Sequence, residues 1–290
     1  MIAQWENKVM SSMLLFLDNQ ICDKGQAYTN VTDQQAYLID SNYNQLTWSA
    51  TNYELQAWAL PFKQIIIDES ITGATICKTV ELSQDGVNYS ITSPQGAHMG
   101  DFNCILHHKG QFLFSDDITA SGFTHAKANC AVKDFNIYIS SKFEEDLLIN
   151  TKYQTHPKIN QTLAGLPDET ETYPAIFLKN MGDTNEPFAF GGEEQTDVRT
   201  RAIVIADNQF MLDAACSIFR DTSKDYIGLL STSEMPFNNL GDFTNYSNYN
   251  YTGITNSKIG TNDSIFIDNV NISKIGGASF AGINNVNPNI

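Results

Sequence analysis

The segment from residue 199 to residue 218 constrains the fold most, because a strand pattern runs directly into a helix pattern. Residues 199–206 read Arg-Thr-Arg-Ala-Ile-Val-Ile-Ala, which predicts a strand. Asp207 follows at the position of a helix N-cap, where its carboxylate can accept hydrogen bonds from backbone N–H groups. An apolar stripe then recurs at helical spacing, formed by Phe210, Met211, Ala214, Ala215 and Ile218. This unit predicts an α/β or α+β core over residues 131–240.

Residues 31–130 are predicted to be β-rich. Residues 62–68 form an apolar run after Pro61 that predicts a strand. Two hairpins are predicted, one turning at Asp85-Gly86 between 75–83 and 88–92, the other at Lys109-Gly110 between 103–107 and 111–114. Short strands at this spacing are typical of a small sandwich or barrel.

Residues 3–21 predict an amphipathic helix, because apolar side chains recur at helical spacing and Asp18 falls outside that stripe. This helix packs either on its own domain or on a neighbouring subunit. Further strands are predicted at 134–140 and 173–179, with a helical turn at 144–149.

The tail is rich in Asn and contains two possible strands, at 264–268 and 270–275. It is either an arm that pairs with a sheet edge, its own or another subunit's, or a disordered tail. The predicted class is therefore α+β: a β-rich sandwich- or barrel-like segment, an α/β core with a mixed sheet, an N-terminal helix and a C-terminal arm. The expected divisions are 1–30, 31–130, 131–240 and 241–290.

The charge and composition of the chain limit the kinds of partner that it is expected to bind. Net charge is −16, and Lys and Arg are scattered singly, so specific nucleic-acid binding is not expected. Charged residues make up 17% of the chain, and a neutral polar surface suits stacking against other proteins, although compositional drift in an AT-rich genome explains it equally well. Five cysteines without a CxxC favour reduced thiols, and the apolar run at 13–17 is too short to span a membrane. We expect a soluble protein that is not secreted.

Motifs for catalysis are not found. The chain has no phosphate-binding glycine loop and no GxSxG, and its paired carboxylates at 144–146, 169/171 and 193–194 lie in polar runs. One stretch holds six possible metal ligands without the short paired spacing that structural zinc uses, so buried cysteine and turn histidine are the favoured roles; they are His98, Cys104, His107, His108, His125 and Cys130. We therefore expect no enzyme activity, no metal and no cofactor.

Several short segments of the sequence resemble those of structural proteins of tailed bacteriophages, especially marine ones, of the neck, tail-completion or tail-terminator type. The segments are Asn-Gln-Thr-Leu-Ala-Gly-Leu-Pro (160–167), Tyr-Pro-Ala-Ile-Phe-Leu-Lys-Asn (173–180), Asn-Glu-Pro-Phe-Ala-Phe-Gly-Gly (185–192), Arg-Ala-Ile-Val-Ile-Ala-Asp (201–207) and Ser-Ile-Phe-Arg-Asp (217–221), with Leu-Phe-Leu-Asp-Asn-Gln (15–20) and Tyr-Asn-Tyr-Thr-Gly-Ile (249–254). The resemblance implies a virion subunit, assembled in the host cytoplasm, in a closed homo-oligomeric ring that contacts neck, tail-tube or sheath proteins. A hexamer is one size for such a ring.

Two other hypotheses stay open. Aromatic residues in 37–58, among them Tyr53, suggest a decoration or host-recognition protein that binds glycans, and a tail-associated hydrolase is the third possibility. Under the ring hypothesis, the residues expected at subunit interfaces are Trp5, Met13, Phe16, Trp48, Trp58, Tyr246, Tyr249 and Tyr251. We refer to these eight as the predicted interface residues.

Overall fold

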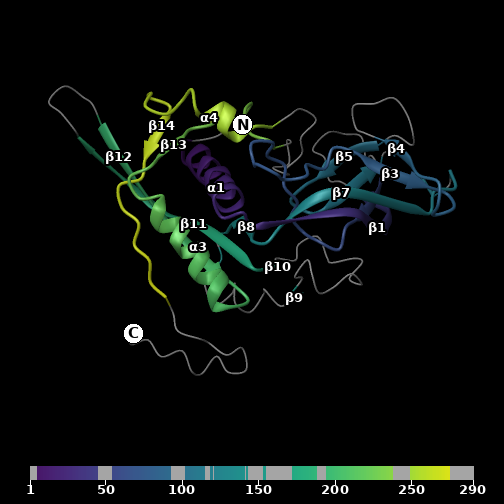
Figure 1. Ribbon diagram of the computed structural model, residues 1–290. Coiled ribbons are helices and arrows are strands. Elements are labelled where there is room, and N and C mark those ends of the chain that lie inside the picture. The colour runs from purple at the N-terminus through teal and green to yellow at the C-terminus, as the bar shows by residue number, and fades with distance from the viewer. Residues whose placement is uncertain are drawn as a thin grey trace.

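A seven-stranded sheet organises the first half of the computed structural model (Figure 1). The structure describes residues 5–44, 54–92, 102–114, 118–119, 121–140, 142, 153–154, 172–187, 194–237 and 249–274. The strand order is β4-β3-β7-β1-β2-β6-β5, and every neighbouring pair is antiparallel. The strands are β1 (Tyr28–Asn44), β2 (Glu54–Ala59), β3 (Val80–Ser83), β4 (Ser90–Thr92), β5 (Phe102–Leu106), β6 (Gln111–Phe114) and β7 (His125–Lys133).

The sheet curls into a half-barrel because its long central strand, β1, is irregular. Its register against β7 shifts between Val31 and Gln34, where Asp33 has a φ of 52°. Its register against β2 shifts twice more, at Asp40. Such bulges increase local twist and bend a strand. The curl encloses a core in which Phe112 and Phe114 are fully buried, so the predicted barrel-like segment is confirmed.

Both predicted hairpins are confirmed. β3 and β4 pair around the turn that holds Gly86, and β5 and β6 pair around the turn that ends at Gly110. These glycines have φ values of 74° and 62°, in the left-handed region that L side chains rarely adopt.

The strand predicted at 62–68 is wrong. This segment is buried and forms only a single bridge, between Ile65 and Val132. Its backbone instead bonds to both sides: the Ile65 N–H donates to the His107 carbonyl (2.9 Å), and the Ile66 N–H donates to the Ala131 carbonyl (2.8 Å). An apolar run signals burial, and here burial is achieved by a segment that joins two parts of the curled sheet.

A second layer is built around helix α1 (Trp5–Asp23), confirming the predicted N-terminal helix. α1 packs on a mixed sheet of order β12-β11-β8, in which β8 runs parallel to β11 and β12 antiparallel to it. Asp18, predicted to lie off the apolar stripe, is 3% exposed, because α1 is covered on nearly all sides from residue 14 to 22. The strands are β8 (Asn136–Ile139), β11 (Ala175–Pro187) and β12 (Glu194–Ile205).

Helix α3 (Gln209–Asp221) follows β12, as the strand–helix pattern predicted, and it packs beside α1. Two details are corrected. The N-cap is Asn208, whose Oδ1 accepts from the Met211 N–H at 2.9 Å, one residue after the predicted Asp207. Phe210 is 83% exposed, because the buried side of the helix is formed by Ala215 and Cys216.

The C-terminal segment from 249 to 274 packs onto this second layer. Strand β13 (Tyr226–Gly228) pairs antiparallel with β14 (Ser264–Phe266), which confirms the first predicted tail strand over three residues. Residues 270–274 are not in a strand. The short helix α4 (Tyr251–Thr255) lies between β13 and β14 in the sequence. In a separate small sheet, β9 (Tyr153–Gln154) pairs with β10 (Thr172–Tyr173).

Two further expectations, a division at 130/131 and a helical turn at 144–149, can be placed against these elements. The expected division at 130/131 falls inside β7, where Cys130 pairs with Val31 and Ala131 with Asn30 of β1. The helical turn expected at 144–149 lies outside the described residues.

Candidate functional site

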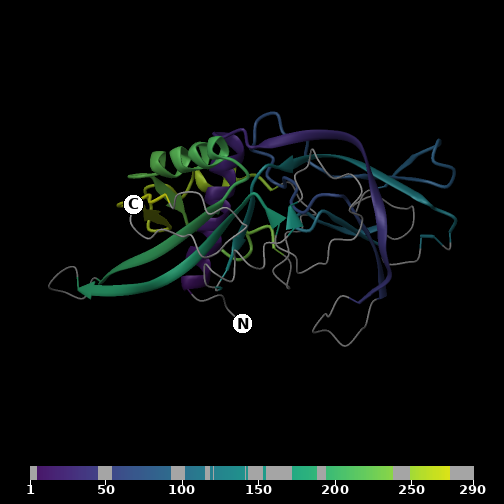
Figure 2. The same cartoon turned by 90° about the horizontal axis from the view of Figure 1, so that it is seen from below.

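The β11–β12 hairpin projects from the body of the molecule (Figure 2). Its strands pair from Ala175 and Ile205 at the base to Pro187 and Glu194 at the far end. β8 pairs with β11 only as far as Leu178. Beyond that point the described residues form a two-stranded ribbon.

The ribbon is exposed beyond its base. Residues 175–178 are buried, whereas residues 181–184 are exposed, and Met181 reaches 52%. The register shifts between Asn180 and Asp183, where Gly182 has a φ of 104° and donates its N–H to the Asn180 Oδ1 at 2.9 Å. A two-stranded ribbon is marginally stable in water by itself, so this arrangement favours contact with another surface.

Exposed polar or charged side chains alternate with half-buried ones along β12. Gln195, Asp197, Arg199 and Arg201 are exposed, while residues 196, 198 and 200 are half-buried. The Gln195 side-chain amide donates to the Asp197 Oδ1 at 3.1 Å. On the opposite face the Thr200 hydroxyl lies 3.9 Å from the Met10 sulfur of α1. The hairpin thus presents one charged face while its other face turns toward the helix.

A buried polar cluster holds the two layers together. The Asp68 carboxylate accepts from the Asn19 side-chain amide (2.9 Å), from the hydroxyl and N–H of Ser70 (2.8 and 2.9 Å), and from the Tyr251 N–H (2.9 Å). Nearby, Lys133 donates to Asp18 at 2.6 Å. Burial raises the pKa of Asp18, and the charge and hydrogen bond of Lys133 oppose that rise. The cluster fixes α1, the 64–70 segment, β7 and the C-terminal segment relative to one another.

Tyr249 completes this cluster. Its side chain is 5% exposed, and its hydroxyl makes no hydrogen bond to the described residues. Burial, and then the negative charges of Asp68 and Asp18, raise its pKa far above the usual value of 10. The phenol therefore stays protonated throughout the physiological range.

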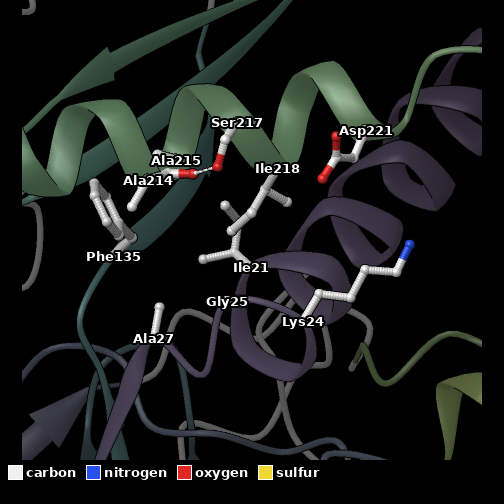
Figure 3. Close-up of a pocket in the computed structure, with 10 residues that line it drawn as sticks. All are labelled: Ile21, Lys24, Gly25, Ala27, Phe135, Ala214, Ala215, Ser217, Ile218 and Asp221. Atoms are coloured by element: carbon white, nitrogen blue, oxygen red, sulfur yellow. Dashed lines mark hydrogen bonds between the residues drawn. The ribbon is translucent and has the colours of Figure 1, made fainter.

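A hollow of about 260 Å³ lies between the C-terminal end of α1 and α3 (Figure 3). Ile21 and Ile218 meet at its centre, and the charged ends of Lys24 and Asp221 lie to one side. Gly25 lies close to α3, since a Cβ there would be 2.6 Å from the Ile218 Cδ1. The lining is largely apolar, as in a packing seam between two helices; it comprises Ile21, Lys24, Gly25, Ala27, Phe135, Ala214, Ala215, Ser217, Ile218 and Asp221.

Four predicted interface residues are buried inside the chain itself. Their exposed fractions are between 3% and 5%, so their packing area is used within one subunit. They are Phe16, Trp58, Tyr249 and Tyr251. Trp58 also donates its indole N–H to the Gln56 Oε1 at 3.1 Å, which places its ring in the core and not on an open aromatic platform.

The other predicted interface residues differ in their positions. Trp5 is 43% exposed at the start of α1. Met13 is half-buried against the second core, the apolar cluster between α1, α3 and the β12-β11-β8 sheet. Trp48 and Tyr246 lie outside the described residues, as does Tyr53. Sequence reasoning missed the outer half of the hairpin, because residues 180–187 and 194–198 carry no apolar alternation.

Three of the possible metal ligands, Cys104, His107 and Cys130, are buried in the packing of the half-barrel. Cys104 and His107 are both buried, and the His107 ring Nε2 lies 3.3 Å from the Cys77 carbonyl. Within the described ranges, no group of three or more His, Cys, Asp or Glu side chains is placed to hold a metal ion. His98 and the carboxylates at 144–146 and 169/171 lie outside those ranges.

Searches with the whole chain identify no relative. No protein-family model, curated protein or solved structure matches it. None of the described helices is both long and apolar enough to cross a membrane. The class defined by the fold is α+β.

Proposed function

We propose that this chain is a structural subunit that acts through contacts with copies of itself and with neighbouring proteins, without catalysis. The observation that carries the proposal is the two-stranded ribbon beyond Leu178, which lies outside the chain's own core. Such a ribbon is only marginally stable by itself in water, and a second protein that covers its faces stabilises it.

The particle that we propose is a tailed-phage virion, in which the subunit forms a ring at the neck or tail. Support comes from the sequence segments that resemble neck and tail-completion proteins, several of which lie on β11, β12 and α3. A closed ring can be built from two kinds of two-fold contact that alternate around it, so the projecting hairpin would supply one contact and a second surface the other.

Oligomeric state tests the proposal directly. Deleting residues 183–198 leaves Asn180 paired with Thr200 across a three-residue loop containing Gly182. We expect the complete chain to form defined oligomers by native mass spectrometry and cyclic particles by electron microscopy. The deletion variant should no longer form cyclic particles, while the near-ultraviolet circular dichroism signal of its Trp and Tyr residues stays unchanged.

A control addresses non-specific loss of association. Ile91→Ser changes an exposed apolar residue on β4, an edge strand of the other sheet. It should leave the oligomer intact. A complete chain that stays monomeric, both when purified and when mixed with particles lacking it, would contradict the proposal.

A further inference from the structure

The outer edge of β12 carries a self-complementary sequence. Residues 196–200 read Thr-Asp-Val-Arg-Thr, so the order of hydroxyl, acidic, apolar, basic and hydroxyl side chains is complementary in charge to its own reversal. In an antiparallel pair of two such strands centred on Val198, Asp197 of each strand lies opposite Arg199 of the other. Opposite charges in directly opposed positions stabilise a strand pair.

The structure places this sequence where a second strand can reach it. β12 is an edge strand of the three-stranded sheet, with β11 on its inner side over its whole length. Asp197 and Arg199 are both exposed and lie on the same face of the strand. A long edge strand is a template for pairing with another chain.

We infer that β12 pairs antiparallel with β12 of a second copy of this chain, around a two-fold axis at Val198. This inference rests on the proposed function and names the partner for the hairpin. Residues 194–202 of one copy then oppose residues 202–194 of the other. The ribbon, exposed in one copy, becomes the middle of a continuous sheet that contains both three-stranded sheets.

Charge favours this register over those with the axis at residue 197, 199 or 200. The charged faces of the two copies lie on the same side of the joined sheet only if each residue opposes one an even number of positions away. The two-fold axis then lies between the two copies of a single residue. An axis at 197 or 199 sets two carboxylates or two guanidinium groups directly opposite each other. An axis at 200 sets Arg199 against the second copy's Arg201. At Val198 both charged pairs are attractive, Thr196 faces Thr200, and the two valines meet at the axis.

Charge reversal tests the pairing with the complete chain. Asp197→Arg alone makes both charged pairs repulsive through cations, and Arg199→Asp alone does so through anions. Each should raise the dissociation constant of the pair at least about tenfold, measured by sedimentation. The double variant D197R/R199D restores attraction and should bind within about threefold of the wild type. A mixture of the two single variants should form heterodimers.

The control for these variants is Asp183→Arg, which reverses an exposed carboxylate on the inner strand of the same hairpin. It should leave the dissociation constant unchanged. If the wild-type chain associates but ignores both single reversals, the strand pairing is overturned while the subunit role stands. If the wild-type chain does not associate at all, both are overturned.

Cross-linking tests the register. The five native cysteines are all buried, so an added thiol reports on its own position. Under mild oxidation Val198→Cys should give a disulfide-linked dimer, since the two positions meet at the axis within disulfide reach. Gln195→Cys should not, because its two copies lie six residues apart along the strands, about 20 Å. Equal cross-linking of the two variants, or none with V198C while dimers persist, overturns the register.

Discussion

Lys133 on β7 donates a hydrogen bond to Asp18 on α1 at 2.6 Å, and only 5% of each side chain is exposed. The two residues are 115 positions apart in the chain. This ion pair joins the curled sheet to the helical layer at a point where water does not screen it.

Removing the cation of this pair should destabilise the protein strongly. Lys133→Met leaves the Asp18 carboxylate buried without its partner, which typically costs about 3–5 kcal/mol in the free energy of unfolding. Urea denaturation at pH 7 measures it. Lys24→Met is the control, because Lys24 is half-exposed and 4.0 Å from Asp225, and it should cost less than about 0.5 kcal/mol. Equal losses in the two variants would contradict a role for the buried pair.

The effect of K133M should also shrink as the pH falls from 7 toward 4. Burial already raises the pKa of Asp18 in the folded chain, and removing the lysine raises it further. A raised carboxyl pKa means that the folded state takes up a proton that the unfolded state does not, so acid favours folding of the variant. A constant loss across this range would show that the carboxylate is not the cause.

Glu234 should give the opposite pH dependence. Burial raises its pKa, but hydrogen bonds from Lys258, from the Ser231 N–H and from the Ser231 hydroxyl outweigh burial and lower it from 4.5 to about 2. A lowered carboxyl pKa contributes stability above about pH 4.5, and that contribution is lost as the pH falls toward 2.

Comparison with Glu234→Gln isolates this contribution. At pH 6 the free energy of unfolding of the wild type should be larger than that of the variant by on the order of 1 kcal/mol, a figure reduced because one third of the Glu234 side chain is exposed. At pH 2–3 the two free energies should converge. Chemical denaturation across this pH range measures the difference. A gap that does not narrow in acid would rule out the ionised form as its source.

Gly110 is expected to be intolerant of any side chain. Its φ is 62°, and an added Cβ would lie 2.2 Å from the Phe62 carbonyl oxygen. Gly260→Ala is a matched control, because its φ is 81° and an added Cβ meets nothing within 4 Å. G260A should cost about 1 kcal/mol from backbone strain alone, and G110A about 1–3 kcal/mol more from the collision. Similar melting temperatures for the two variants would argue against the close approach.

Two phenylalanines on α3 should behave differently. Phe210 is 83% exposed, whereas Phe219 packs half-buried against the second core. Phe210→Ala should change the free energy of unfolding by less than about 0.5 kcal/mol, and Phe219→Ala should lower it by about 1–3 kcal/mol. Thermal unfolding followed by circular dichroism compares them, and a larger loss for F210A would reverse the assignment of the buried side.

Local chemistry explains what the sequence could predict. Both hairpins of the half-barrel turn at glycines whose backbone conformation few other residues adopt, so Gly86 and Gly110 are visible in the sequence itself. Helix α1 was predictable from apolar periodicity. Its burial around Asp18 was not, because the partner Lys133 is fixed by tertiary packing alone.

Pairing between distant segments explains the rest. Residues 62–68 were predicted as a strand because burial and strand formation share one apolar signal, and only the fold shows that Ile65 bridges to Val132. The outer part of the hairpin lacked that signal altogether. β12 was predicted from residue 199, but it begins at Glu194, where polar residues pair across an exposed ribbon.

The packing of α1 against the C-terminal segment from residue 249 affects how the chain folds during its synthesis. Helix α1 leaves the ribosome about 200 residues before its neighbours Leu230, Tyr249 and Tyr251. At usual elongation rates the helix waits roughly 10–50 s for them. Throughout that interval its apolar surface is available to molecular chaperones, and the core that α1 shares with Tyr249 and Tyr251 closes only after those residues have emerged.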